Sequence, residues 1–264
     1  MFVLGTDIGS TTSKCVIIDE TGEIKGKGLA PGGAGSDGPY KALDMALAEA
    51  RIAQKSLSRT ISTGYGRNLV DKKDGTLSEL VCHALGAHAL FPDTRTVIDI
   101  GGQDAKILRV GEKGRLESFV MNDKCAAGTG RFLENISRAL NVRIEDMTAF
   151  AELAENKIDI SSTCAVFAES EIVSQLAHGA NKNDVFSAVF RSVASRAASL
   201  ANRIGVMRDT VMTGGVAKNE GVRKALEEEL NVRIYVSPLA QYAGALGAAV
   251  YALEPLTNDR GKIQ

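Results

Sequence analysis

Two cysteines stand at turns that lead into helical sequence. Cys125 lies in the run 122–134, followed by small residues and glycines, and Cys164 follows the polar run 160–163. A cysteine close to a helix N-terminus lies near free backbone N–H groups and the positive end of the helix dipole, which favour the thiolate. Thiolates bind metal ions and iron–sulfur clusters. The chain has no Cys-x-x-Cys spacing, so it encodes no self-contained zinc or iron–sulfur motif.

Two cysteines cannot fill the four-thiolate shell that a [4Fe–4S] cluster or a Cys₄ zinc site prefers. Most soluble oligomers are twofold symmetric, so a cluster on a dimer axis would take Cys125 and Cys164 from each subunit. The alternative is that both thiols are buried and have no ligand role. The residues alone do not decide between a shared cluster and buried thiols. Cys15, in an apolar strand, and Cys82, on a helix, are expected to be small buried hydrophobes.

A second group of candidates lies in two similar strand–turn–strand segments, 7–14 and 99–106. They align with a constant offset, and the identical pairs are Asp7/Asp99, Ile8/Ile100, Gly9/Gly101, Lys14/Lys106, Glu20/Glu112 and Gly22/Gly114. An internal repeat of this kind predicts two halves that begin with the same β-hairpin.

Both turns have the composition of a phosphate site, because glycine lets the backbone approach a phosphate and successive N–H groups form an anion nest. The predicted nucleotide-binding residues are Ser10, Thr11, Thr12, Ser13, Lys14, Gly101, Gly102 and Gln103. Asp7 and Asp99 are expected to face each other and hold Mg²⁺ through water. Gln103 or Asp104 would orient the attacking water. Gly214, Gly215 and Val216 follow a buried strand and would lie against an adenosine.

The periodicity of apolar residues predicts an α/β protein. Expected strands are 2–7, 15–19, 23–29, 60–63, 115–121, 209–212 and 232–236, with a further hairpin over 96–110. Expected helices are 40–56, 78–90, 130–140, 144–155, 166–178, 185–204, one from 219, and 241–251. We expect two domains: residues 1–92 with the C-terminal helix (about 242–257), and residues 93–241.

Composition narrows the function classes. The 264 residues carry a net charge of -1, and the pI is about 6.3. No basic patch calls for nucleic acid or a membrane surface. No secretory signal or membrane-spanning run is evident, so we expect a cytoplasmic protein.

Segments 7–14, 99–106 and 212–219, in that order, resemble the phosphate-1, phosphate-2 and adenosine motifs of the actin/Hsp70/sugar-kinase superfamily. The Walker and Rossmann patterns are absent. The resemblance implies a duplicated actin-like (ribonuclease H-like) ATPase fold, with two similar halves around a nucleotide cleft.

The cysteine segments 121–133 and 160–171 are similar to the ATP-dependent activators of 2-hydroxyacyl-CoA dehydratases, also called archerases. These belong to the BadF/BadG/BcrA/BcrD-type ATPase family. Segments 63–68, 211–216 and 237–241 are similar too, so the resemblance runs from Gly5 to about Ala252. The Lys14–Cys15 pair resembles the glutaryl-type activator.

This resemblance implies a homodimer that shares one oxygen-labile [4Fe–4S] cluster through Cys125 and Cys164 of each subunit. It places nucleotide contacts at Ser10 to Lys14, Gly102, Gln103, Gly214 to Val216 and Gln241. The implied activity couples ATP hydrolysis to transfer of a low-potential electron to a partner dehydratase, and a ferredoxin or flavodoxin is the implied electron donor.

Three alternatives remain at this stage. The chain could be the ATPase subunit of a benzoyl-CoA-type reductase. It could be a small-molecule kinase, although the sequence shows no insertion to build an acceptor pocket. It could also be an actin-like scaffold that polymerises and holds no iron.

Overall fold

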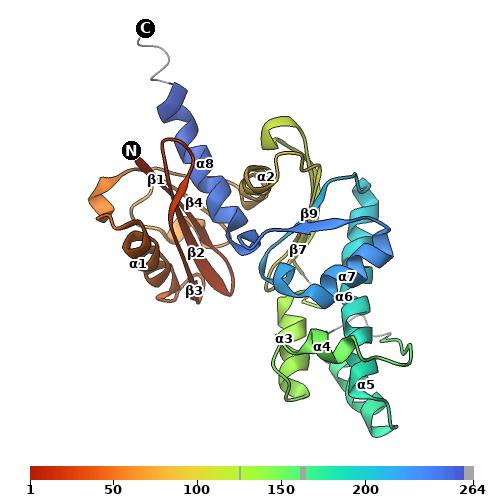
Figure 1. Cartoon of the computed structure of the whole chain (residues 1–264). Helices are drawn as coiled ribbons and strands as arrows, with labels where there is room; N and C mark the ends of the chain where they lie inside the picture. Colours follow the sequence, from red (N-terminus) through yellow and green to blue (C-terminus); the bar gives the residue numbers. More distant parts are fainter. Residues whose placement is uncertain (125, 161–164, 259–264) are drawn as a thin grey trace. The chain divides into compact units, whose positions relative to one another are not determined.

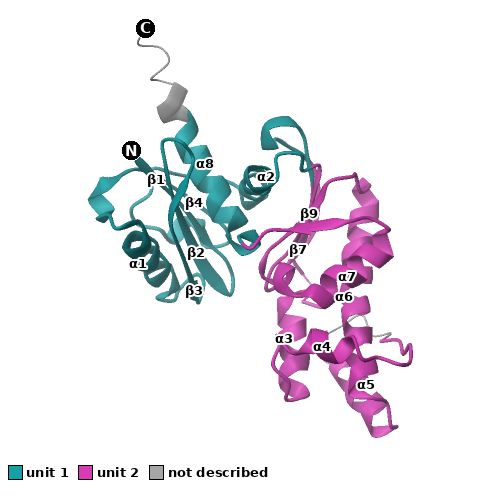
Figure 2. Cartoon of the chain, viewed as in Figure 1, with its two compact units in different colours: residues 1–94, 109–117, 239–264 teal, residues 95–108, 118–238 magenta. Residues whose placement is uncertain are grey.

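The computed structural model describes residues 1–124, 126–160 and 165–258, and the chain forms two compact units (Figures 1 and 2). Unit 1 comprises Met1–Thr94, Arg109–Glu117 and Leu239–Gln264, and unit 2 comprises Arg95–Leu108 and Ser118–Pro238. The short segment 109–117, which the sequence analysis assigned to the second half, therefore belongs to unit 1.

Unit 1 is built on a five-stranded sheet in the order β3-β2-β1-β4-β5. The strands are β1 (Phe2–Ile8), β2 (Thr12–Asp19), β3 (Ile24–Pro31), β4 (Leu57–Thr63) and β5 (Gly75–Thr76). β1 pairs antiparallel with β2 and parallel with β4. The central β1 therefore delivers its last residues, including Asp7, to the turn that begins β2.

Helices cover both faces of this sheet (Figure 1). On one face α1 (Gly38–Ala50) packs on a core that includes Leu4 and Ile17. On the other face α8 (Ala243–Asn258) covers a core that includes Val3 and Val16, and α2 (Glu79–Leu90) packs against α8. Neighbouring residues of one strand face opposite sides of the sheet, so β1 and β2 supply both cores.

Close packing of α8 depends on glycine. A Cβ at Gly5 of β1 would clash with the backbone of Ala245, and one at Gly247 of α8 would clash with the carbonyl of Cys82 in α2. Backbones approach this closely only where no side chain stands between them. The face of α8 that carries small residues therefore allows this helix to pack closely on β1 and α2.

The sheet β10-β9-β6-β7-β8 lies mostly in unit 2, and the end of β7 and the start of β8 fall within residues 109–117 of unit 1. Its strands are β6 (Thr96–Ile100), β7 (Ala105–Val110), β8 (Leu116–Asn122), β9 (Thr210–Thr213) and β10 (Ile234–Val236). The helices of unit 2 are α3 (Gly130–Ala139), α4 (Met147–Ala151), α5 (Ala165–Ala177), α6 (Lys182–Ile204) and α7 (Glu220–Leu230). β9 pairs parallel with both β6 and β10.

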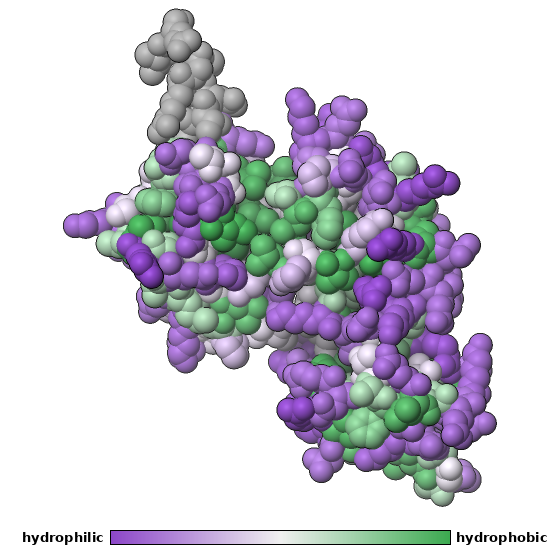
Figure 3. Space-filling model, in the orientation of Figure 1, coloured by the Kyte–Doolittle hydropathy of each residue, from purple (hydrophilic) through white to green (hydrophobic). Residues whose placement is uncertain are grey.

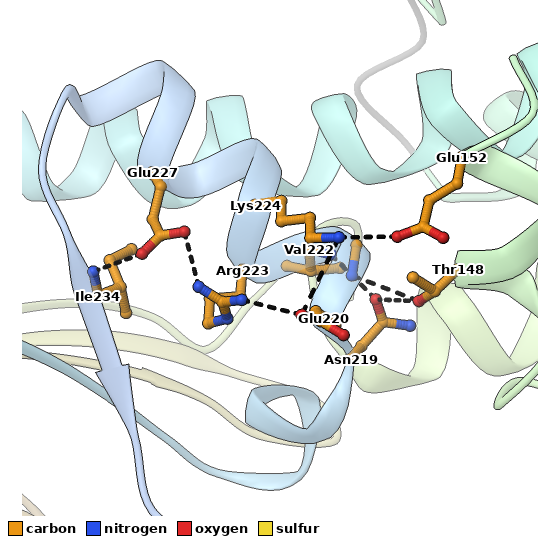
Figure 4. A network of polar contacts seen from close by, with 10 residues as sticks. Thr148, Glu152, Asn219, Glu220, Val222, Arg223, Lys224, Glu227 and Ile234 are labelled. Atoms are coloured by element: carbon orange, nitrogen blue, oxygen red, sulfur yellow. Dashed lines mark hydrogen bonds and ion pairs between the residues drawn. The ribbon is translucent and has the colours of Figure 1, made fainter.

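Polar contacts attach α4 to the start of α7 (Figure 4). The Asn219 side chain caps α7 by accepting from the N–H of Val222 at 2.9 Å, and it lies 3.5 Å from the Thr148 hydroxyl. Lys224 of α7 pairs with Glu152 just after α4 at 2.7 Å. The short α4 is therefore fixed to the helix that follows β9.

Two predicted helices are shorter than expected. The helix predicted over 40–56 ends at Ala50, because Arg51 adopts a left-handed backbone (φ 55°); a short 3-10 turn, Gln54–Ser56, then leads into β4. The helix predicted over 144–155 is reduced to α4, because the Asp184 carboxylate accepts hydrogen bonds from the N–H groups of Glu155 and Asn156.

Within the described residues, every helix is too short or too polar to span a lipid bilayer. Hydrophobic and charged residues are mixed over the visible surface of both units (Figure 3).

Candidate nucleotide site and cysteine segments

The first hairpin joins β1 to β2 through a tight turn. The N–H of Gly9 donates to the carbonyl of Thr12 at 3.0 Å. Across the two strands, Lys14 Nζ lies 3.2 Å from Asp7 Oδ2, and both side chains are largely buried. The sequence repeat therefore marks a cross-strand ion pair at the base of a glycine turn.

Two glycines leave room for the Asp7 carboxylate. A Cβ at Gly64, whose φ is 87°, would clash with Asp7 Oδ1, and one at Gly244 would lie 3.0 Å from Asp7 Oδ2. Both glycines therefore pack closely against this carboxylate, which is 4% exposed. A carboxylate is a ligand type that Mg²⁺ uses, directly or through water.

The hydroxyl residues of this turn differ in exposure. Ser10 is exposed, and Thr11 and Thr12 are partly exposed. Ser13 is fully buried, and its hydroxyl donates to the carbonyl of Gly32 at 2.8 Å. Ser13 thus already uses its hydroxyl to fix the segment after β3, and a phosphate contact from the turn falls to the other three residues and to backbone N–H groups.

The second hairpin repeats this geometry. The N–H of Gly101 donates to the carbonyl of Asp104 at 2.9 Å, as Gly9 does to Thr12. Lys106 Nζ lies 3.4 Å from Asp99 Oδ2 and 2.6 Å from Asp104 Oδ2, and the Lys106 side chain is only 3% exposed. The Asp104 carboxylate is thus held by Lys106, and Gln103 is exposed at the turn.

The segment predicted to contact adenosine lies beside this hairpin. β9 pairs with β6 so that Thr213 is opposite Asp99, and the Thr213 hydroxyl donates to Asp99 Oδ1 at 2.7 Å. Gly214 has φ 85°, and a Cβ there would clash with the carbonyl of Ile100. Gly215 is exposed and Val216 is buried. Predicted phosphate and adenosine segments therefore meet at the carboxyl ends of two neighbouring parallel strands.

Sequence reasoning overlooked two partners of Asp99. Lys106 occupies the repeat position of Lys14, so the repeat itself could have identified it. Thr213 carried no such signal, because its contact with Asp99 depends on which strands become neighbours. In unit 1, the predicted Gln241 lies in the 3-10 turn Ala240–Tyr242 and is partly exposed.

Cys125 lies outside the described residues, and the segment after it is hydrogen-bonded to the turn of the second hairpin. The Thr129 hydroxyl lies 2.6 Å from the carbonyl of Ala126 and 3.0 Å from that of Gly102. The N–H groups of Gly130 and Arg131 donate to the carbonyls of Gly101 and Gly102, each at 2.9 Å. The start of α3 is therefore bonded to the turn of the second hairpin. These two N–H groups therefore have acceptors within that turn.

Cys164 also lies outside the described residues, and the chain leading toward it is held by α6. The carboxylate of Asp184 accepts from the N–H groups of Glu155 and Asn156 at 2.8 and 2.9 Å, and Arg191 donates to the carbonyl of Ile158 at 2.6 Å. The hydrogen bonds from Asn156 are the main cause that lowers the pKa of Asp184. Both contacts attach residues 155–158 to the longest helix of unit 2.

The chain as a whole matches a protein-family model. Residues 4–252 match the BadF/BadG/BcrA/BcrD ATPase family. The chain belongs to this family. A relative from Acidaminococcus fermentans, the (R)-2-hydroxyglutaryl-CoA dehydratase activating ATPase, is 51% identical over 96% of this chain and 97% of the relative. The activator of lactoyl-CoA dehydratase from Anaerotignum propionicum is 48% identical over 96% of this chain and 98% of its own length.

Solved structures of the family agree in fold. The activator of the 2-hydroxyisocaproyl-CoA dehydratase from Clostridium difficile, with bound ADPNP, has a TM-score of 0.95 at 42% identity, covering 100% of this chain and 98% of that one. A ROK-family glucokinase from Streptomyces griseus has a TM-score of 0.56 at 16% identity, covering 96% of this chain and 100% of the kinase. The second likeness shows the fold alone. The predicted actin-like ATPase fold is confirmed.

The structure describes two of the four cysteines of this ATPase, Cys15 and Cys82. Cys15 and Cys82 are buried free thiols in unit 1. Burial, with the nearby Asp7 carboxylate, raises the pKa of Cys15, and burial raises that of Cys82 to about 12. Both cysteines are buried, as expected from the sequence, and burial disfavours the thiolate form that binds metal. Within the described residues no group of three or more Cys, His, Asp or Glu could hold a metal ion. Cys125 and Cys164, which are predicted to hold the cluster, lie outside the described residues.

Proposed function

We propose that this ATPase activates a 2-hydroxyacyl-CoA dehydratase by transferring an electron to it, and that ATP hydrolysis drives this transfer. In this proposal the chain is a homodimer, and Cys125 and Cys164 of each subunit hold one [4Fe–4S] cluster. When bound, the cluster supplies a one-electron donor. A ferredoxin or flavodoxin re-reduces the dimer. The relatives described above are named for dehydratases of different acyl groups, so acyl specificity belongs to the partner dehydratase.

The proposal gives the residues of the two hairpins the following roles in ATP hydrolysis. Asp7 and Asp99 hold Mg²⁺, Lys14 and the exposed hydroxyls of the first turn bind phosphate, and Gln103 or Asp104 orients the attacking water. Gly214, Gly215, Val216 and Gln241 contact the nucleoside. The buried Lys106 keeps the carboxylates of the second hairpin in position before nucleotide arrives.

One observation supports the coupling between ATP and the cysteines. The carbonyls of Gly101 and Gly102 accept hydrogen bonds from Thr129, Gly130 and Arg131, which follow Cys125 by only a few residues. A displacement of the turn when a phosphate binds or leaves must therefore move the start of α3 or break these bonds. Rigid elements joined in this way are how small shifts at a ligand reach a second site.

The first test is the iron and acid-labile sulfide content of the dimer, purified without oxygen. We expect about four of each per dimer and a brown, reducible chromophore. Cys125→Ser and Cys164→Ser should each abolish iron binding and leave ATP binding intact. Cys15→Ala and Cys82→Ala are matched controls, because they remove buried thiols from unit 1, and both should retain iron.

Two results would contradict the proposal. Full iron content in Cys164→Ser would show that Cys164 is not a ligand of the cluster. A colourless, iron-free dimer that hydrolyses ATP would favour the kinase or scaffold alternatives.

A further inference from the structure

Three elements of unit 1 meet at the carboxylate of Asp7. Asp7 lies near the end of β1 and is 4% exposed. The helix α2 carries His83, which is 7% exposed, and α8 begins beside both residues. The nucleotide site described above does not include this buried histidine.

Gly244, the second residue of α8, relates the two side chains. The point that a Cβ would occupy at Gly244 lies 3.0 Å from Asp7 Oδ2 and 3.0 Å from His83 Nε2. The two atoms are therefore separated by no more than twice this distance. One bridging water can cover such a span with two hydrogen bonds of ordinary length. The imidazole Nε2 thus lies within reach of the carboxylate.

Close packing fixes the place from which His83 extends. A Cβ at Gly86 of α2 would clash with the carbonyl of Ala243, and one at Gly247 of α8 would clash with the carbonyl of Cys82. Cys82 and Gly86 lie on either side of His83 in α2. The backbone of α2 is therefore held against α8 just before and just after the histidine.

The other neighbours of the Asp7 carboxylate do not set its orientation in the same way. Lys14 Nζ lies 3.2 Å from Oδ2, and a Cβ at Gly64 would clash with Oδ1. A lysine ammonium is a point charge on a flexible stem, whereas an imidazole N–H donates in one direction from a rigid ring. Carboxylates that hold a metal are commonly oriented by such an outer hydrogen-bond donor.

We propose that His83 is a positioning residue for ATP hydrolysis. Its Nε2 donates to the Asp7 carboxylate, directly or through one water, and holds it in the orientation that serves the Mg²⁺ of the nucleotide. This inference rests on the role of Asp7 in the proposed function. Loss of an outer partner of this kind typically lowers metal affinity by about 10- to 100-fold.

The test compares two substitutions that differ in reach. The amide of His83→Gln ends close to the position of the imidazole Nε2, whereas that of His83→Asn ends near Nδ1. Calorimetry measures binding of the ATP analogue ADPNP to the purified protein over a range of Mg²⁺ concentrations and in EDTA. His83→Asn should raise the Mg²⁺ requirement about tenfold, and His83→Gln should stay close to wild type. Binding in EDTA should be the same in all three proteins.

Two results would overturn the proposal directly. One is a Mg²⁺ requirement of His83→Asn equal to that of wild type. The other is an equal loss in the Gln and Asn variants, or a loss that persists in EDTA, because packing and not the Nε2 donor would then explain it.

The matched control is His88→Asn on the same helix. A Cβ at Gly114 would lie 3.0 Å from the Cβ of His88, so His88 packs against the segment 109–117. His88→Asn should have the Mg²⁺ requirement of wild type, and urea denaturation checks that each variant is folded. If both Asn variants raise the requirement equally, the effect belongs to α2 as a whole, and the inference fails.

Asp7→Asn separates this inference from the proposed function. If Asp7→Asn leaves the Mg²⁺ requirement unchanged, the proposed role of Asp7 is wrong and the inference fails with it. If Asp7→Asn raises the requirement and His83→Asn does not, only the inference fails. The double variant should need no more Mg²⁺ than Asp7→Asn alone, because His83 acts through Asp7. Additive losses would show independent action and contradict the assignment.

Discussion

The two repeated hairpins share a motif but differ in what is bonded to their turns. Each has an aspartate–lysine pair across its strands and the same turn hydrogen bond. In the first, the turn region contacts the segment after β3 through Gly32. In the second, the turn carbonyls accept from Thr129, Gly130 and Arg131. The first turn is therefore bonded to the segment after β3, and the second is bonded to the segment that follows Cys125.

The largest expected difference between the hairpins concerns their lysines. Lys106 is 3% exposed and neutralises two carboxylates, whereas Lys14 is 13% exposed and pairs with one. Removing one partner of a buried ion pair typically costs about 3–5 kcal/mol. Lys106→Met should therefore lower the unfolding free energy by about that amount, and Lys14→Met by less, as measured by urea denaturation. Equal losses would contradict the difference in burial.

Glycines of similar φ provide the next comparison. Gly22 and Gly214 both have φ 85°, but a Cβ at Gly22 meets no atom within 4 Å, whereas one at Gly214 clashes with Ile100. Gly22→Ala should cost about 1 kcal/mol from backbone strain alone. Gly214→Ala should cost about 3 kcal/mol and weaken nucleotide binding. A Gly214→Ala variant as stable as Gly22→Ala would show that unit 2 adapts to the added methyl group.

These comparisons also show what sequence can reveal. The hairpins, the repeat and the buried cysteines follow from local pattern: glycine turns, alternating strands and apolar runs. The Thr213–Asp99 contact does not, because it requires knowing that β9 lies beside β6. The shortening of α4 does not either, since it is caused by Asp184 on a later helix. The contacts that the sequence did not predict are therefore those between residues far apart in the chain.

Thr129 tests transmission directly. Thr129→Val removes the hydroxyl near Gly102 and Ala126 and should cost about 1 kcal/mol of stability. If the second hairpin transmits, the variant should still bind ATP, but nucleotide should change the redox potential of the dimer less than in the wild type. Ser137→Ala is the control, because it removes one side-chain hydrogen bond at the other end of α3, to Val142. If nucleotide changes the redox potential of Thr129→Val as much as that of the control and the wild type, the Thr129 hydroxyl does not have the proposed role.

The smallest effect concerns the approach to Cys164. The pKa of Asp184 is lowered in the folded protein, chiefly by its hydrogen bonds with Asn156. Its stabilising contribution is therefore present above the unfolded pKa of about 4 and is lost as pH falls through the lower folded value. Asp184→Asn should be less stable than wild type at neutral pH, and the two should converge as the solution is acidified. Parallel pH profiles in urea denaturation of the cluster-free protein would falsify this assignment.

The seating of α8 on β1 has a consequence for biosynthesis. Unit 1 is assembled from residues at both ends of the sequence, whereas most of unit 2 comes from the intervening stretch. A domain made on the ribosome tends to fold once its residues have emerged. Until Ala243 and the residues after it are made, one face of β1 lacks its cover, and Gly244, one of the two glycines beside Asp7, is missing. Most of unit 2 is made before that point, so the nascent chain can form the second hairpin before unit 1 is complete.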